Sequence, residues 1–362
     1  MNAGKRTAEI TISGLTVGET YVASANLIAV SHGFSITLFD TSYGIVLDGD
    51  TVNATGPYSL TFVATQTSHV IGLGARQSTA ATVTVDNVSV RLADPDRSVN
   101  GKGVGVHGSL TKAPVATGAD VVGYSGFNSS NYLEQPFNAD LNFGAGDFCV
   151  MGWFKTSASG TDYIIQRSPD GTGVGDGFFV WVDGNGNLGF ATRSGSSSFI
   201  TGATDVTTGV WHHFAAVRTN SGVNLAIYLD GNIDATGTVT ARTVTGVDQQ
   251  LYVGVRADKA NSFTGSLALL RISATAPTAD QIAKIYNDEK FLFQENAKAT
   301  LYGSSDAVTA LAHDPVTDLL HVGTSSGRSV FQGLRRVEES TGTDSQSLAA
   351  ISAVDGLVVE GK

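Results

Sequence analysis

Residues 177–187 read Gly-Phe-Phe-Val-Trp-Val-Asp-Gly-Asn-Gly-Asn, an apolar stretch that ends in a polar turn. Bulky side chains fill both alternating sets of positions from Phe178 to Val182, which predicts a strand that is apolar on both faces. Glycine and asparagine tolerate positive φ, so residues 183–187 are predicted to form a hairpin turn. A short apolar strand leading into a tight turn favours an antiparallel sheet.

Similar strands precede and follow this one, and a short helix with apolar spacing is predicted at 277–286. Their spacing predicts a β-sandwich over residues 116–290, closed by the helix. The predicted strands include 148–154, 163–165, 210–217, 225–231, 251–254 and 263–272.

Four motifs carry a family resemblance: Gly-Asp-Phe at 146–148, Trp-His-His-Phe-Ala-Ala-Val at 211–217, Tyr-Leu-Asp-Gly at 228–231 and Phe-Thr-Gly-Ser at 263–266. Through them residues 116–290 resemble the laminin-G-like, concanavalin A-type lectin jelly roll. The resemblance implies two stacked sheets, on a fold that hosts lectins, enzymes and adhesion modules alike. Members commonly carry an acidic residue where this chain has Ala268. The resemblance therefore gives no support for a calcium ion at that position. Calcium binding elsewhere in the chain stays open.

Residues 1–93 show alternating strands at short spacing, and they resemble an incomplete carbohydrate-binding module of the β-sandwich type. The resemblance rests on 12–21 (Ile-Ser-Gly-Leu-Thr-Val-Gly-Glu-Thr-Tyr) and 85–90 (Val-Asp-Asn-Val-Ser-Val). Residues 94–115 are polar and rich in glycine, so they are predicted to be a linker. The spelling Gly103-x-Gly105-x-x-Gly108 falls in this segment, but it lacks the preceding strand and following helix of a dinucleotide site.

Residues 291–362 are predicted to be a β-meander tail and an assembly region. Three strands are expected between 308 and 332, and the polar segment 338–346 is expected to be loose. One isolated meander buries little surface, so it needs a neighbour. The stretch 314–329 resembles the tails of phage tail-fibre and minor tail proteins. We accordingly expect a homotrimer in which repetition raises avidity.

The composition excludes several classes of function. The 362 residues carry a net charge of −11, which argues against binding a nucleic-acid backbone. The hydrophobic fraction of 41% supports real cores, but no apolar run is long enough to span a membrane. No signal peptide is predicted, and the single cysteine excludes a disulfide framework. The expected fold class is all-β: two jelly-roll or sandwich domains followed by a short meander.

Catalysis and metal binding find little support in the sequence. Glucanases of this fold place paired carboxylates on one strand, yet no glutamate occurs between Gln135 and Asp288. The sequence from Asp183 begins like a calcium loop, but the positions that should be Gly and Glu are Leu188 and Ser194. We predict a non-enzyme with no catalytic residue, no metal site and no cofactor.

A carbohydrate site is predicted around the apolar strand. Phe179 and Trp181 share one face and stand beside a polar turn, an arrangement typical of sugar stacking. The alternative is that a loop or another subunit covers this face. The candidate binding residues are Trp181, Phe179, Asp183, Asn185, Tyr163 and Tyr132.

These features lead to one main hypothesis and two alternatives. The main one is a phage tail-fibre or virion surface protein that is assembled in the host cytoplasm and binds host-surface glycans alongside other tail or capsid proteins. The first alternative is a structural decoration protein that uses lectin-like folds for protein contacts. The second is a bacterial adhesin or an ancillary module of a larger enzyme.

Overall fold

The computed structural model describes residues 8–31, 33–49, 51–74, 82–94, 102–169, 176–246, 248–304, 307–341, 351–352 and 358–359. Within these ranges the helical elements are α1 (Ala279–Glu289), η1 (Ala139–Leu141) and η2 (Lys290–Phe293), and strands make up most of the rest. The predicted all-β fold class is confirmed. The chain divides into two compact units, Met1–Lys112 with Tyr124–Ile282, and Ala113–Gly123 with Ala283–Lys362.

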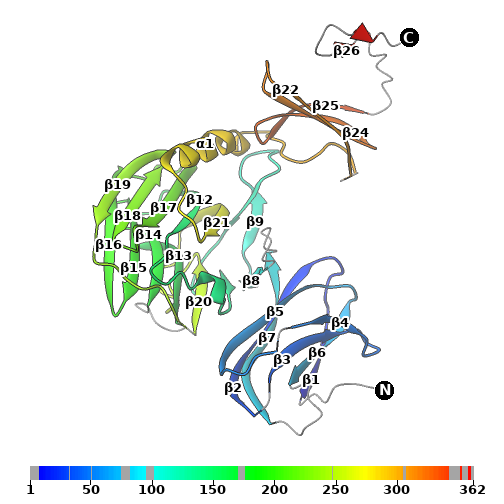
Figure 1. The fold of residues 1–362 in the computed structure, drawn as a ribbon, viewed down its shortest axis with the longest axis vertical. Coiled ribbons are helices and arrows are strands. Elements are labelled where there is room, and N and C mark those ends of the chain that lie inside the picture. The colour runs from blue at the N-terminus through cyan, green and yellow to red at the C-terminus, as the bar shows by residue number, and fades with distance from the viewer. Residues whose placement is uncertain are drawn as a thin grey trace. The chain divides into compact units, whose positions relative to one another are not determined.

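The first strands form a sandwich with its own core (Figure 1). One sheet has the order β1-β6-β3-β4, and the strands β7-β2-β5 form the end of a longer, ten-stranded sheet. Apolar side chains from both layers meet in one cluster, in which Phe34, Leu38 and Phe62 are almost wholly buried. The strands are β1 (Ala8–Ser13), β2 (Thr20–Val30), β3 (Ser35–Phe39), β4 (Ile45–Asp48), β5 (Gly56–Val63), β6 (Ser68–Gly74) and β7 (Val83–Asp94).

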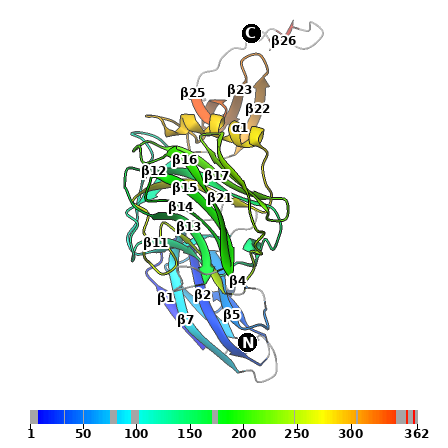
Figure 2. The same ribbon diagram turned by 90° about the vertical axis from the view of Figure 1, so that its left-hand side faces the viewer.

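A larger sandwich follows, and its two sheets enclose the main core (Figure 2). One sheet has the order β19-β18-β17-β12-β21-β10-β9, and the other runs β16-β15-β14-β13-β20-β11-β8 before continuing into β7. Its strands are β8 (Val104–His107), β9 (Thr111–Pro114), β10 (Val122–Ser125), β11 (Tyr132–Gln135), β12 (Phe148–Thr156), β13 (Asp162–Pro169), β14 (Gly177–Val182), β15 (Asn187–Ser194), β16 (Ser196–Asp205), β17 (His212–Thr219), β18 (Asn224–Leu229), β19 (Asn232–Thr238), β20 (Gln249–Val253) and β21 (Gly265–Ser273).

Phenylalanines dominate this core. Phe148, Phe154, Phe178 and Phe190 are fully buried, and the ring of Phe148 meets those of Phe178 and Phe190 in tilted and edge-to-face contacts. Cys149 lies beside them on β12 at 1% exposure. Burial raises the pKa of its thiol to about 12. The cysteine is therefore a small packing group with an unreactive, protonated thiol.

A buried arginine joins two loops at one end of this sandwich. Arg218 on β17 is fully buried, and its guanidinium stacks on the ring of Phe148 at 4.6 Å. It donates hydrogen bonds to the carbonyls of Gly144 (2.9 Å), Gly146 (3.0 Å from Nε) and Arg242 (2.9 Å). The side chain thus supplies donors to three backbone carbonyls, of which that of Gly144 also accepts the N–H of Val244 at 2.8 Å.

The segment 94–115 differs from the predicted linker, because it contains β8 and β9. Strand β8 pairs with β7 on one side and with β11 on the other. A Cβ at Gly105 would stand 3.0 Å from Cγ1 of Val22 and 3.4 Å from the carbonyl oxygen of Glu134. The glycine here permits close packing of strands, a role that composition alone does not separate from linker flexibility.

The second unit contains a four-stranded antiparallel sheet of order β22-β23-β24-β25, and the short pair β26 (Ile351–Ser352) and β27 (Val358–Val359) follows. Its strands are β22 (Val308–Asp314), β23 (Leu319–Thr324), β24 (Gly327–Gln332) and β25 (Arg335–Thr341). The three strands predicted between 308 and 332 are present, and β25 adds a fourth. Residues 338–341 belong to β25 and are not loose, whereas residues 342–346 of the same predicted segment lie outside the described residues. Strand β25 escaped detection because a charged, exposed edge strand lacks apolar alternation.

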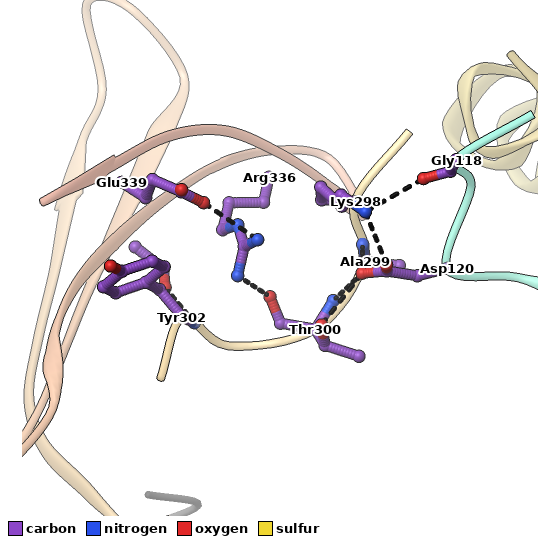
Figure 3. Close-up of polar contacts among 9 residues, drawn as sticks. Gly118, Asp120, Lys298, Ala299, Thr300, Tyr302, Arg336 and Glu339 are labelled. Atoms are coloured by element: carbon purple, nitrogen blue, oxygen red, sulfur yellow. Dashed lines mark hydrogen bonds and ion pairs between the residues drawn. The ribbon is translucent and has the colours of Figure 1, made fainter. Parts of the chain in front are cut away.

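Asp120 fastens the two segments of the second unit to each other (Figure 3). Its carboxylate accepts hydrogen bonds from Nζ of Lys298 (3.2 Å), the N–H of Ala299 (3.0 Å), and both the N–H (3.3 Å) and Oγ1 (2.8 Å) of Thr300. Next to this contact, Arg336 donates to the carbonyl of Thr300 at 2.9 Å. One carboxylate thus ties residues 298–300 to a loop about 180 positions earlier in the chain.

Candidate functional site

The alternation of β14 sorts its aromatic side chains between two environments. Phe178, Val180 and Val182 face the main core and are at most 1% exposed. Phe179 and Trp181 point to the opposite face of the sheet and are half-buried. The predicted strand is thus apolar on both faces, with one face in the core and the other partly open to solvent.

Strand pairing brings further aromatic rings to this outer face. Tyr163 on β13 stands opposite Trp181. The ring centroids of Tyr163, Phe179 and Trp181 lie 5.2–6.5 Å apart, with interplanar angles of 25–40°. Phe199 on β16 meets Trp181 at 6.3 Å and 61°, and it is 59% exposed. We call these four residues the aromatic platform.

Gly189 determines how the indole of Trp181 lies. It stands opposite Trp181 on the neighbouring strand β15. A Cβ at position 189 would fall 2.2–2.6 Å from Cε2, Cζ2 and Cδ2 of the indole. The ring therefore lies against the backbone of β15 in space that any other residue would fill. A ring held in this way turns one face outward, which is the geometry needed for stacking.

An ion pair borders the platform beside Tyr163. Nε and Nη2 of Arg256 donate to Oδ1 (2.8 Å) and Oδ2 (2.6 Å) of Asp258, and the guanidinium lies 5.7 Å from the ring centroid of Tyr163. The hydrogen bonds from Arg256 hold the pKa of Asp258 below its ordinary value, while burial raises the pKa of Tyr163. At neutral pH the pair is charged on both sides and the tyrosine is neutral.

Tyr132 lies in a different aromatic group of the same unit. It stacks on His107 with centroids 4.3 Å apart and lies 6.1 Å from Tyr252. Nζ of Lys259 stands 4.9 Å from the Tyr132 ring centroid and 3.8 Å from that of Tyr252. Tyr132 is only 8% exposed, and none of the ring contacts found joins it to the aromatic platform.

The two polar candidates lie in the hairpin turn that follows β14. Oδ1 of Asp183 accepts hydrogen bonds from the N–H groups of Asn185 (2.8 Å) and Asn187 (3.0 Å). This carboxylate oxygen therefore stabilises the turn, as the sequence pattern led us to expect. Asn185 is exposed. Among the described contacts, neither side chain touches a ring of the platform, and their part in binding stays a prediction.

Three features of the site were not found from the sequence. Phe199 sits in a serine-rich stretch, and only its alternation with the inward-facing Ile200 signals an outward position. The role of Gly189 in positioning the indole is visible only from the strand register, which places it opposite Trp181. Arg256 and Asp258 reach Tyr163 from a loop 90 residues away in sequence, which no local pattern reveals.

The described residues contain no group of three or more His, Cys, Asp or Glu side chains placed to hold a metal ion. Ala268, where the resemblance placed an acidic residue, is buried and pairs with Trp153. Among the helices of the described ranges, none has the length and apolar character needed to cross a bilayer.

Comparison with known proteins agrees with this geometry. The family described as the concanavalin A-like lectin/glucanases superfamily matches residues 127–283. Residues 127–283 are thus similar to concanavalin A-like lectin and glucanase domains. The matched region includes the strands from β11 to β21 and the whole aromatic platform, in agreement with the predicted laminin-G-like jelly roll. A comparison with curated proteins gives no match.

Among solved structures, the chain resembles several binding domains in fold. The binding domain of Paraclostridial mosquitocidal protein 1 is 15% identical, with 74% of this chain and 70% of that chain covered and a TM-score of 0.45. The binding domain of botulinum neurotoxin DC in complex with SialylT is 15% identical, with coverages of 66% and 59% and a TM-score of 0.44. A heptameric SAP-like pentraxin from Limulus polyphemus is 19% identical, with coverages of 39% and 70% and a TM-score of 0.34. The chain spans about three fifths of the botulinum domains that it matches.

Proposed function

We propose that the chain is a non-enzymatic binding protein whose jelly roll holds glycans on the aromatic platform. The observation that carries this is the half-buried indole of Trp181, which lies against Gly189 on the outer face of the sheet and has Phe179, Tyr163 and Phe199 around it. Sugar rings stack on such surfaces through their apolar C–H faces, while polar groups at the rim fix their orientation.

A binding role agrees with what the jelly roll lacks. No glutamate occurs between Gln135 and Asp288, whereas the glucanases of this fold use paired glutamates. The charged groups beside the platform, Arg256 and Asp258, are hydrogen-bonded to each other. Because the hydrogen bonds keep the pKa of Asp258 low, this carboxyl is a poor general acid at neutral pH.

The biological setting that we propose is attachment of a phage tail fibre or virion to glycans of the host surface. Support comes from the stretch 314–329, which resembles phage tail proteins, and from a chain with a single cysteine, which suits assembly in a reducing host cytoplasm. Other tail or capsid proteins would then be its partners. The exposed ring of Phe199 also suits a structural decoration protein, in which the platform would be a protein interface.

Assembly into a homotrimer through the second unit completes the proposal. Strand β22 is an edge of its sheet, carries no lysine, arginine or proline, and exposes Val308 (53%) and Leu311 (66%). The opposite edge, β25, carries four charged residues (Arg335, Arg336, Glu338 and Glu339). Edges that stay free in solution are normally charged, so the exposed apolar side chains of β22 are suited to pack against those of two other copies about a threefold axis. Light scattering at micromolar concentration is expected to give three times the mass of one chain, and a monomer would contradict this assembly.

The platform is tested by Trp181→Ala. We expect glycan binding to fall at least about tenfold, because a lost stacking contact costs roughly 1.5 kcal/mol per site. The thermal unfolding temperature should change little, since the indole lies on an outer face of the sheet. The measurement is a glycan array followed by calorimetric titration of the strongest binder.

Two further variants separate binding from folding. Gly189→Ala leaves all four rings present but pushes the indole off β15, so it should weaken binding as well.

Trp211→Ala removes a half-buried indole next to β17, in the other sheet, and should leave binding unchanged. Equal binding by the wild type and Trp181→Ala would refute the platform as the glycan site. Loss of assembly in place of binding would support the structural alternative.

A further inference from the structure

We propose that the aromatic platform selects uncharged sugar rings and that the Arg256–Asp258 pair sets this selectivity. The inference rests on the proposed function, since it concerns the same surface. It adds the chemical class of the ligand, which the rings alone leave open because stacking accepts neutral and acidic sugars alike.

The ion pair is placed to meet a sugar that lies on the platform. Tyr163 contacts both groups: its ring centroid lies 6.5 Å from that of Trp181 and 5.7 Å from Cζ of Arg256, so the ion pair borders the rings. The side chains of Arg256 and Asp258 are 27% and 28% exposed. Each of them therefore keeps part of its hydrogen-bonding surface in solvent, next to the position of a stacked ring.

The pairing geometry disfavours a carboxylate on the ligand. A guanidinium recognises a carboxylate best through two parallel N–H donors, and Arg256 already uses Nε and Nη2 on Asp258. An acidic sugar would approach a fork that is occupied and a carboxylate of its own sign. The rings of the platform contribute no net charge and the Arg256–Asp258 pair is neutral as a whole, so this group of residues offers an acidic sugar no excess positive charge.

The same geometry favours hydroxyl groups. A sugar hydroxyl both donates and accepts, so it can donate to the remaining lone pairs of Asp258 and accept from Nη1 of Arg256. The loop also holds the pair in place: Oδ1 of Asp258 accepts the N–H of Ala260 at 3.1 Å, and the N–H of Arg256 bonds to the carbonyl of Ala260 at 3.2 Å. The donor and acceptor are thus positioned before the ligand arrives.

The test uses the full chain and matched pairs of probes that differ by one carboxylate. Suitable pairs are N-acetyllactosamine with and without a terminal sialic acid, and a neutral hexose oligomer with and without uronic acid units. We expect the wild type to bind the neutral member of a pair at least about fivefold more tightly. Asp258→Asn frees the guanidinium fork, so the acidic member should gain about tenfold and the preference should disappear.

Asp288→Asn is the matched control. It removes the carboxylate of another exposed ion pair, Lys284–Asp288 (2.8 Å), by the same chemical change. It should leave the neutral preference intact. Thermal unfolding of each variant verifies that it is folded.

A measurement on the wild type alone keeps the inference testable if Asp258→Asn fails to fold. Binding of the neutral probe should be almost independent of salt between about 50 and 500 mM, because no charge is neutralised on binding. A wild type that prefers the acidic probes, with binding that falls in salt and is lost in Trp181→Ala, would overturn the neutral selectivity and leave the glycan platform standing. Binding that is unaffected by Trp181→Ala, or absent for every probe, would refute the platform itself and the selectivity with it.

Discussion

Arg218→Met is expected to lower the free energy of unfolding of the jelly roll by about 4 kcal/mol. The substitution keeps an apolar stem over Phe148 but removes the guanidinium donors from the carbonyls of Gly146 and Arg242, and leaves that of Gly144 only the N–H of Val244 among the described contacts. Charge-assisted hydrogen bonds contribute about 1.5–3 kcal/mol each, and buried acceptors left unsatisfied add a desolvation penalty. Urea unfolding followed by intrinsic fluorescence measures the change.

Arg193→Met is the matched control for this prediction. Arg193 is half-buried on β15 and bonds only within its own hairpin, to Oγ of Ser197 and the carbonyl of Gly195. We expect it to cost less than about 1 kcal/mol. An equal loss of unfolding free energy in both variants would contradict the role given to Arg218, because its hydrogen bonds to two loops would then contribute no more than those of Arg193.

Asp120→Asn is expected to destabilise the second unit by about 2 kcal/mol, because the amide accepts through one neutral oxygen only and turns its NH2 group toward the donors that met the other carboxylate oxygen. Hydrogen exchange measured by mass spectrometry should show faster exchange in residues 113–123 and 283–341, with the jelly roll unchanged. The two units can open separately, so a global melting curve is the less direct measurement.

The same contact predicts how stability depends on pH. Burial alone would raise the pKa of Asp120, but the hydrogen bonds from Ala299, Thr300 and Lys298 outweigh it and the pKa is lowered. A carboxyl with a lower pKa in the folded state contributes its full stability above the unfolded pKa of about 4, and that stability is lost as the pH falls through the folded value.

Asp120→Asn should remove this component of the acid sensitivity. Asp314→Asn is the control, since Asp314 accepts hydrogen bonds only from Val316 and Thr317 in its own turn. Protection of residues 113–123 that stays the same in Asp120→Asn would contradict the role given to the carboxylate.

The fold could be predicted from the sequence wherever one face of a strand is apolar. Alternation or a continuous apolar run placed β2, β3, β12 and β14, since β14 buries one set of its side chains fully and β3 and β12 bury nearly all of theirs. Strand β25 lay beyond this method, since its charged residues stand on an exposed edge. Strand β8 was missed for a different reason: its glycine allows close strand packing, and glycine in a sequence favours a linker equally well.

The candidate site was predictable only within single strands and their neighbours. Alternation places Phe179 and Trp181 on one face, and Tyr163 joins them in the structure. Tyr132 was grouped with them by residue type, but strands β13 and β20 separate its strand from β14. The contact of Arg256 with Tyr163 depends on where a distant loop crosses the sheet, and only the tertiary structure determines that.

The position of Cys149 makes the chain suitable for site-specific labelling. The thiol stays protonated at neutral pH and is out of reach of a maleimide reagent, because it is buried on β12 with a pKa of about 12. No other cysteine occurs in the sequence. A cysteine introduced at the exposed position 199 would therefore be the only thiol to react. A fluorophore attached there, next to the indole of Trp181, would report the arrival of a ligand without removal of the native cysteine.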